Sequence, residues 1–430
     1  MMKQYVIVGA SAAGIAAAEA IRTGDAAARI IMISDEAEPP YFRVMLSFVL
    51  AGKFDRKKMP LRPEKFYRSL DIAPLFGKRV VSLEPQKNRV TLDDRTSIGY
   101  DALLLATGAR PWPLTVPGSD RDGVFYFRTG RDLDAITAML KPSGRAVVIG
   151  GGLVGIKVAD ALLDRKMDVT MMVSSNTILS QTADPGTADM VLKTFKQRGV
   201  TIMTGTYPKE FQGRGNDLET VVTNNGDRLA CQLAVIGKGV LPNTDLAAQA
   251  SLDVGKGIIT NLYLGTNIPN IFAAGDAAQT LDIVSGQPEL HSIWPAAVEE
   301  GRTAGFNMCG MNLNFWGTIQ QNAFYINGSH VITGGMFNPH KNNEGKGNGD
   351  DEYRVLEAHD HKKNVHHRIV TRNHRIVGMG FVNDTASAGV ALAMIRRKQT
   401  VFSLPPNIAS SGLKAGRVYT HGREHEIGHH

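Results

Sequence analysis

The feature that most constrains this chain is a pair of glycine-rich turns, each lying between an apolar run and an alanine- or leucine-rich stretch. The first is Gly9-Ala10-Ser11-Ala12-Ala13-Gly14, after Val6-Ile7-Val8, and the second is Gly150-Gly151-Gly152-Leu153-Val154-Gly155, after Val147-Val148-Ile149. Each predicts a buried strand that turns sharply into a helix, whose free N–H groups and positive end then face a diphosphate. One such turn can be an ordinary strand-to-helix connection, but two in this context predict two bound dinucleotides.

The residues after each following strand predict which nucleotide is bound. The predicted strand Arg29–Ser34 ends in Asp35 and Glu36, which places an acid where a ribose diol would be held. In the second unit, the strand Asp168–Val173 ends at the uncharged Ser174. No arginine cluster follows to attract a 2′-phosphate, so NADH and NADPH both stay open. Asp184 and the lack of nearby arginines favour NADH.

Composition agrees with an α/β enzyme and excludes several other classes. The 430 residues are 43% hydrophobic and include 45 glycines, but no uninterrupted apolar stretch is long enough to span a bilayer. Basic residues are not interleaved with stacking aromatics, which argues against nucleic-acid binding. The two cysteines, Cys231 and Cys309, lie too far apart in sequence for a Cys-x-x-Cys dithiol and are too few to hold an iron–sulfur cluster. Few cysteines predict a reducing, cytoplasmic setting.

The pattern of strands and glycines predicts a fold of two dinucleotide-binding Rossmann-like domains and a smaller C-terminal α+β domain. We expect a first domain over 1–112, a second nucleotide domain over 113–240, a return to the first domain over 241–315 and a third domain over 316–430. In the third domain, Phe337–Tyr353 predicts a long loop, 365–370 and 376–381 predict strands, and 388–397 predicts a helix.

The order of motifs resembles one enzyme superfamily over roughly the first 310 residues. A glycine turn, Ala106-Thr107-Gly108, a second glycine turn and a late Gly275-Asp276 are similar to the FAD-dependent pyridine nucleotide-disulfide oxidoreductases. Pro40–Ser47 and Ile293–Gly301 resemble the branch without a redox disulfide. That branch includes NADH:rubredoxin and ferredoxin reductases, the flavin part of nitrite reductases, and the NAD-linked flavoprotein subunits of 2-oxoacid dehydrogenases such as that for phenylglyoxylate.

This resemblance implies the cofactors FAD and NAD, with NADP not excluded, and a set of binding residues. Those expected around FAD are Gly9, Ser11, Ala13, Gly14, Asp35, Glu36, Arg43, Ser47, Val80, Ala106, Thr107, Gly108, Arg110, Gly275, Asp276, Trp294 and Pro295. Those expected around the nicotinamide nucleotide are Gly150, Gly152, Leu153, Val154, Gly155, Ser174 and Gly237. The helix that begins near Trp294 would direct its positive end at the flavin, favouring the anionic reduced form. No side chain is expected to act as a catalytic acid, base or nucleophile.

Two departures from the family pattern narrow the chemistry. Val44 stands where NADH oxidases and peroxidases place a peroxidatic cysteine, which disfavours chemistry through a sulfenic acid. Lys157 stands where ferredoxin-reductase relatives carry a glutamate near the nicotinamide.

Because no internal dithiol or cluster follows the flavin, an electron acceptor must reach the flavin directly. The resemblance therefore implies an iron–sulfur or rubredoxin-type carrier, or the other subunits of a larger complex, so that the protein would be a hetero-oligomer. An NAD(P)H oxidase acting directly on oxygen, and a non-enzymatic redox-responsive flavoprotein, are the alternatives.

Charged and titratable clusters suggest two further hypotheses. The chain carries a formal charge of +7, and a basic cluster follows Ser47: Lys53, Arg56, Lys57, Lys58, Arg62, Lys65 and Arg68. It could steer an acidic carrier or simply be a solvated helix face. The histidines could suggest a metal, but no zinc motif accompanies them, so we expect no metal site. They are His359, His361, His366 and His367, with His421, His425, His429 and His430 in the tail.

Overall fold

The computed structural model describes residues 2–339 and 353–401. The chain forms two compact units, and neither is a continuous stretch of sequence. Among the described residues, unit 1 contains 2–49, 53–112 and 240–318, and unit 2 contains 50–52, 113–239, 319–339 and 353–401. The tail histidines and most of the predicted 337–353 loop lie outside the described residues. The three domain boundaries predicted from the sequence stay predictions.

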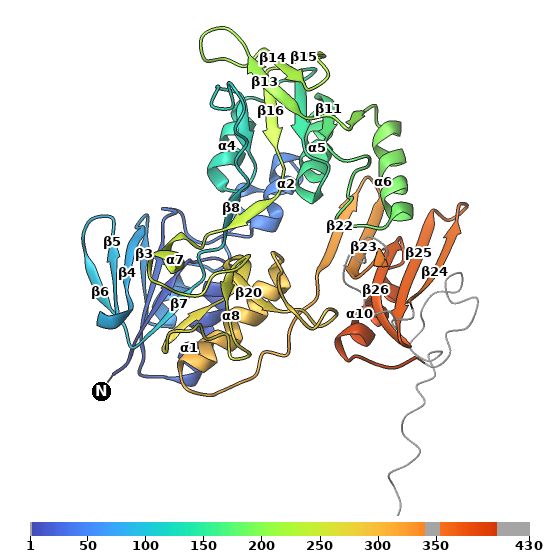
Figure 1. Cartoon of the computed structure of the whole chain (residues 1–430). Helices are drawn as coiled ribbons and strands as arrows, with labels where there is room; N and C mark the ends of the chain where they lie inside the picture. The colour runs from blue at the N-terminus through green and yellow to red at the C-terminus, as the bar shows by residue number, and fades with distance from the viewer. Residues whose placement is uncertain (1, 340–352, 402–430) are drawn as a thin grey trace, which may run out of the picture. The chain divides into compact units, whose positions relative to one another are not determined.

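Unit 1 is built on a five-stranded parallel sheet in the order β19-β7-β1-β2-β3 (Figure 1). Its strands are β1 (Gln4–Val8), β2 (Arg29–Ser34), β3 (Ile72–Phe76), β7 (Ala102–Leu105) and β19 (Ile271–Ala273). Residues alternate between its two faces, so Ile7 packs into one apolar cluster and Val6 into another. Both faces are covered, which is why the strands read as continuous apolar runs.

Helices α1 (Ala12–Gly24) and α8 (Trp294–Met308) cover one face of this sheet. They pack closely because small residues meet: a Cβ on Gly301 would overlap the carbonyl of Ala13. The other face carries an antiparallel sheet of β4 (Val80–Glu84), β5 (Arg89–Leu92) and β6 (Ser97–Gly99).

Short elements complete unit 1. They are η1 (Arg43–Met45), α2 (Leu46–Leu50, whose last residue is counted in unit 2), η2 (Arg56–Lys58), α3 (Lys65–Ser69), η3 (Pro85–Lys87), β8 (Ala109–Pro111), β17 (Val240–Pro242), α7 (Asp245–Gln249), β18 (Ile258–Ile259), η4 (Gly275–Ala277), β20 (Ala278–Leu281) and β21 (Pro288–Leu290).

Unit 2 contains a second five-stranded parallel sheet, in the order β12-β11-β10-β16-β9. Its strands are β9 (Val124–Tyr126), β10 (Arg145–Ile149), β11 (Asp168–Val173), β12 (Thr201–Thr204) and β16 (Leu233–Ile236). Helices α4 (Gly130–Ala138), α5 (Leu153–Asp164) and α6 (Pro185–Gln197) accompany this sheet, as does the antiparallel sheet β13 (Pro208–Gln212), β14 (Thr220–Thr223) and β15 (Arg228–Ala230).

The C-terminal part of unit 2 is an antiparallel sheet in the order β22-β23-β26-β25-β24. It comprises β22 (Gln321–Ile326), β23 (Ser329–Gly335), β24 (Tyr353–Asp360), β25 (Val365–Arg372) and β26 (Arg375–Val382), followed by α10 (Thr385–Arg396). The two strands and the helix predicted for this part are therefore confirmed. So is the predicted fold class of two Rossmann-like domains with a smaller α+β domain.

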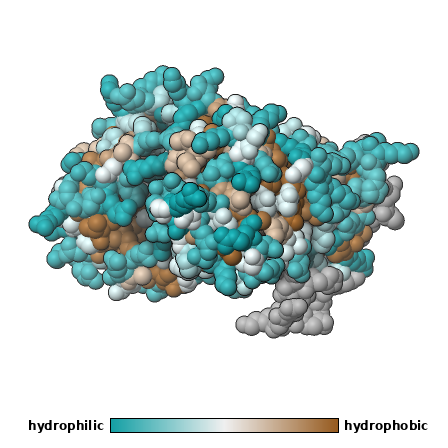
Figure 2. Space-filling model, turned by 90° about the horizontal axis from the view of Figure 1, so that it is seen from above, coloured by the Kyte–Doolittle hydropathy of each residue, from teal (hydrophilic) through white to brown (hydrophobic). Residues whose placement is uncertain are grey.

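Among the described residues, no helix has both the length and the apolar character needed to cross a bilayer. Figure 2 shows hydrophilic residues over most of the face in view, with apolar residues in smaller areas between them.

Candidate dinucleotide-binding sites

The first glycine turn lies at the carboxyl end of β1 and makes strand and helix approach closely. Gly9 has φ +111°, and a Cβ there would overlap the carbonyl of Ala106. A Cβ on Gly14 would overlap the carbonyl of Gly9. Ser11 is the N-cap of α1 but makes no side-chain capping bond. The helix start therefore keeps its N–H groups for a ligand, and the turn fits a dinucleotide diphosphate.

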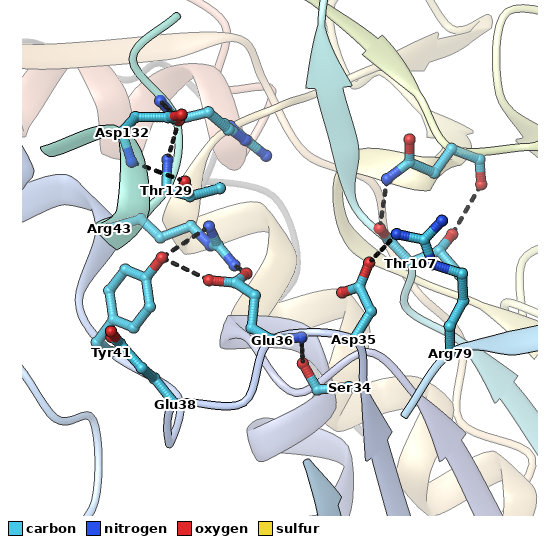
Figure 3. Close-up of polar contacts among 12 residues, drawn as sticks. Ser34, Asp35, Glu36, Glu38, Tyr41, Arg43, Arg79, Thr107, Thr129 and Asp132 are labelled. Atoms are coloured by element: carbon cyan, nitrogen blue, oxygen red, sulfur yellow. Dashed lines mark hydrogen bonds and ion pairs between the residues drawn. The ribbon is translucent and has the colours of Figure 1, made fainter. Parts of the chain in front are cut away.

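The two acids after β2 have different surroundings (Figure 3). Glu36 accepts a hydrogen bond from the Tyr41 hydroxyl at 2.6 Å and forms an ion pair with Arg43. Asp35 is more exposed and lies 3.5 Å from Arg79. The structure thus distinguishes two acids that the sequence left equivalent, because Glu36 is the one held in place.

Arg43 connects this acid with the late Gly-Asp motif. Its guanidinium lies 5.0 Å from the centre of the Tyr41 ring. Burial opposes the charge of Arg43, but Glu36, Tyr41 and Asp276 outweigh it and raise the pKa of the guanidinium. Arg43 therefore stays charged between two acids that the sequence separates widely.

The Ala106-Thr107-Gly108 segment is fixed by a residue that the sequence gave no reason to select. The Thr107 hydroxyl donates to the Asn243 carbonyl at 2.8 Å, and the Asn243 side-chain amide donates back to the Thr107 carbonyl at 2.8 Å. Arg110 donates to the Asn243 side chain at 3.0 Å and pairs with Asp245 at 3.1 Å. Asn243 directly follows the short strand β17, and no motif in the sequence marks it.

Gly275 and Asp276 form the short helix η4 directly after β19. The backbone N–H of Gly275 donates to Glu300 of α8 at 2.7 Å. Because β1, β2, β7 and β19 are parallel neighbours, the glycine turn, the acids, Thr107 and Asp276 all follow strands that end at one edge of the sheet. These residues fit the two ends and the middle of an extended dinucleotide.

The remaining predicted FAD residues include Trp294, Pro295, Ser47 and Val80, and their positions say less about how a dinucleotide would bind. Helix α8 begins at Trp294 with Pro295 in its first turn, as predicted, and the Trp294 ring lies 5.7 Å from that of Phe42. Ser47 lies in α2, next to the Arg43 segment. Val80 begins β4 and packs against the cluster on the far face of the sheet.

The second glycine turn repeats the geometry of the first. Gly150 has φ +115°, and a Cβ there would lie 2.5 Å from the Gly237 carbonyl oxygen. A Cβ on Gly155 would overlap the Gly150 carbonyl. Gly152 is the N-cap of α5, and Leu153 and Val154 begin the helix. Because glycine has no side chain, it cannot cap the first N–H groups of the helix. This turn likewise fits a diphosphate.

A cavity of about 680 Å³ lies against the loop that follows β11. The same loop contacts the second turn, since the Leu179 backbone N–H donates to the Gly151 carbonyl at 2.7 Å. Residues 175–177, 180 and 181 line it from the loop after β11, and residues 320 and 335–338 line it from the C-terminal part of the same unit. None of these lining side chains is charged. Ser175 lines the cavity, whereas Ser174 is exposed and does not.

Asp184 does not contribute to this cavity. Its side chain is buried, caps α6 by accepting from the Thr187 backbone N–H at 3.0 Å, and lies 2.9 Å from Nε2 of His366. The argument from Asp184 for NADH is therefore wrong, because this acid packs against the C-terminal sheet. Lys157 of α5 is half-buried, and burial lowers the pKa of its ammonium group.

Burial raises the pKa of both cysteine thiols. Cys231 is buried, and burial raises the pKa of its thiol to about 12. Cys309 follows α8, and its thiol lies 3.7 Å from the Ile21 carbonyl. Both are unpaired, and Val44 occupies η1. A thiolate, the reactive form of cysteine, is thus strongly disfavoured at Cys231.

One group among the described residues has ligand-type atoms close together: Asp184, Glu357 and His366. Asp184 already accepts from Thr187 and lies 2.9 Å from Nε2 of His366, and Glu357 pairs with Arg368. The contacts are those of a buried polar pair that joins the N-cap residue of α6 to β25.

Glutamates partly neutralise the basic cluster after Ser47. Arg56 pairs with Glu38 at 3.0 Å, Arg62 with Glu19 at 2.8 Å and Arg68 with Glu64 at 2.9 Å. Lys57 and Lys58 are exposed.

Residues 3–301 match the family described as "Pyridine nucleotide-disulphide oxidoreductase". The chain belongs to this family. It is an FAD-dependent NAD(P)H oxidoreductase of the branch without a redox disulfide, as the sequence predicted.

Three similar proteins show the range of the family. The chain is 28% identical to a nitrite reductase [NAD(P)H] of Bacillus subtilis over 93% of its own length but spans only 48% of that protein. It is 28% identical to the NADH-dependent phenylglyoxylate dehydrogenase subunit epsilon of Aromatoleum evansii, over 96% of each chain. The reductase chain in the crystal structure of a covalent putidaredoxin reductase–putidaredoxin complex superposes with a TM-score of 0.86 and 26% identity, covering 95% of this chain and 98% of the other.

Proposed function

We propose that this oxidoreductase exchanges electrons between a nicotinamide nucleotide and an iron–sulfur or rubredoxin-type protein, as the flavin subunit of a larger redox complex. The observation that carries the proposal is the placement of its thiols. Cys231 is buried with a raised pKa, the Cys309 thiol lies against Ile21 near the carboxyl end of α1, opposite the glycine turn at its start, and η1 holds Val44. Electrons therefore have no internal dithiol to pass to.

The similarities support a protein acceptor. One similar structure is a reductase joined to putidaredoxin, and one similar chain of matching length is a subunit of a phenylglyoxylate dehydrogenase. When bound, FAD supplies the conversion between two-electron transfer with NAD(P)H and one-electron transfer with a carrier. The residues of unit 1 would hold it at the carboxyl edge of the parallel sheet. We propose a reducing cytoplasmic location, which the two unpaired cysteines support.

The test uses the FAD-loaded protein without oxygen. NADH should bleach the flavin absorbance, and a ferredoxin or rubredoxin should restore it within seconds while a small disulfide does not. If only oxygen restores the colour rapidly, the protein is an oxidase and the proposal is wrong. Co-purification of the native chain with an iron–sulfur subunit would support the complex, and a single monomeric species would contradict it.

The basic cluster supplies a second arm of the same experiment. The double variant K57E/K58E should lower carrier reduction about tenfold at low salt and make it less sensitive to ionic strength. The double variant K141E/K209E, which reverses the charge of two exposed lysines in unit 2, is the charge-matched control. An unchanged rate and salt dependence in K57E/K58E would mean that this surface does not dock the carrier.

A further inference from the structure

Glu300 is a buried acid that neither glycine turn uses. It lies on α8, and its side chain is 1% exposed. One carboxyl oxygen accepts the Gly275 backbone N–H at 2.7 Å, and the other accepts the Thr280 hydroxyl at 2.9 Å. The carboxyl group therefore joins α8 to the first residue of η4 and to the strand β20 that follows it.

The bond to Gly275 determines the backbone just before Asp276. Gly275 has φ +75°, a conformation that side chains rarely adopt, and a Cβ there would lie 3.2 Å from the Cβ of Ala13 in the first glycine turn. The turn is thus held between α1 and the Glu300 carboxyl group. If that group were removed, a buried N–H would lose its acceptor, which is costly in an apolar interior.

We propose that Glu300 is a positioning residue for FAD. Its carboxyl group fixes the Gly275–Asp276 turn that holds the cofactor, and the carboxyl proton is coupled to the redox state of the flavin. This inference rests on FAD binding alone. It does not depend on which protein or molecule accepts the electrons.

The surroundings of Glu300 raise the pKa of its carboxyl group. Burial is the largest cause that raises the pKa of this carboxyl, Asp276 and Glu299 add to it, and the hydrogen bonds from Gly275 and Thr280 oppose it, so that the pKa is raised to about 8. Arg43 of η1 is a cation that interacts electrostatically with Asp276. Below the raised pKa the group is neutral, and above it a buried negative charge appears next to the cofactor-binding turn.

That charge should disfavour reduction, because reduction adds electrons to the flavin. A reduced flavin would in turn favour the protonated carboxyl, with the proton taken from solvent. Reduction of the flavin and protonation of Glu300 are therefore linked, so that each changes the equilibrium constant of the other. Couplings of this kind typically change an affinity by about 5-fold to 150-fold.

Glu300→Gln tests the coupling and keeps the shape. A glutamine can accept from Gly275 with its carbonyl and donate to the Thr280 oxygen with its amide, so both contacts survive without a titrating proton. We expect E300Q to bind FAD within about twofold of wild type at pH 6, measured by flavin fluorescence. The flavin midpoint potential should match that of wild type at pH 6 and exceed it at pH 9.

Glu300→Ala tests the positioning. Loss of both contacts should weaken FAD binding about tenfold or more, because Gly275 keeps a buried unpaired donor. Glu299→Gln is the control for FAD binding, since it changes a neighbouring exposed acid on the same helix. Wild type is the reference for the potential, because Glu299 itself raises the pKa of Glu300.

The inference is wrong if E300Q and wild type have the same potential from pH 6 to pH 9, or if E300A holds FAD as tightly as E299Q. Should E300A fail to fold, the comparison of E300Q with wild type still decides the coupling. Neither measurement needs an acceptor protein, so failure here is distinguishable from failure of the proposed electron-transfer function.

Discussion

The two glycine turns have almost the same backbone and very different neighbours. Gly9 and Gly150 have φ of +111° and +115°. In each turn, a Cβ on the last glycine would overlap the carbonyl of the first glycine, so only glycine lets the helix pack this closely. After β2, however, Glu36 is held by Tyr41 and Arg43. After β11, the cavity is lined by uncharged side chains.

This difference separates two tasks. The turn binds a diphosphate through backbone groups, which every dinucleotide shares. The residues after the next strand select the rest of the nucleotide, and here only the first site carries an acid to do so. We therefore expect a selective FAD site and a permissive nicotinamide nucleotide site.

The largest expected effect comes from replacing Gly9 or Gly150, each of which should disrupt the nucleotide site at its own turn and leave the other site intact. Gly9→Ala should weaken FAD binding by about 3 kcal/mol or more, roughly a hundredfold, because its Cβ overlaps a backbone carbonyl. Gly150→Ala should keep the flavin colour but slow flavin reduction by NADH. Gly389→Ala in α10, where a Cβ meets open space, is the control. Release of FAD by Gly150→Ala would show that the sites are not independent.

The choice between the two acids after β2 gives the next effect. Glu36→Gln removes both the ion pair to Arg43 and a charged acceptor, so FAD binding should weaken about tenfold, or about 1.4 kcal/mol. Asp35→Asn removes the more exposed acid, which lies 3.5 Å from Arg79, and should change FAD affinity little. Equal losses in both variants, measured by fluorescence titration, would remove the special role of Glu36.

A charge placed in the second cavity should make the permissive site selective. Ser175→Asp should lower kcat/KM for NADPH relative to NADH by about tenfold, because a carboxylate repels a 2′-phosphate, and Ser175→Arg should do the reverse. Ser174→Asp is the matched control, since Ser174 does not line the cavity. A larger change in selectivity from Ser174→Asp would place the adenosine ribose elsewhere.

The smallest expected effect is on acid stability. Each unit holds a buried pair at 2.9 Å, His291 with Asp282 in unit 1 and His366 with Asp184 in unit 2. Burial raises the pKa of each aspartate, but hydrogen bonds from histidine and neighbours outweigh it, so both pKa values are lowered below 3.8. Each pair stabilises the folded state above about pH 4, and this contribution is lost as pH falls below 4.

Urea unfolding at pH 5 and pH 3 checks this expectation. Wild type should lose about 1 kcal/mol per pair over that interval, and Asp184→Asn should lose less because it no longer titrates. An identical pH dependence in Asp184→Asn would mean that the pair does not contribute to acid stability.

The sequence by itself predicted the fold class, the two turns, the strands that precede them and the helix at Trp294, and all of these are confirmed. These features are local: a strand entering a helix through a left-handed glycine needs only adjacent residues to specify it. That Val44 stands in place of a peroxidatic cysteine could also be recognised from the sequence, because it concerns one position in one motif.

Tertiary structure decided what depends on partners distant along the chain. Asn243 meets Thr107 across 136 residues, and Glu300 meets Gly275 across 25 residues. The same holds for Asp184, which lies against His366 rather than a nucleotide. Hydrogen-bond partners of this kind follow from sheet order and helix packing, so no pattern of neighbouring residues can select them.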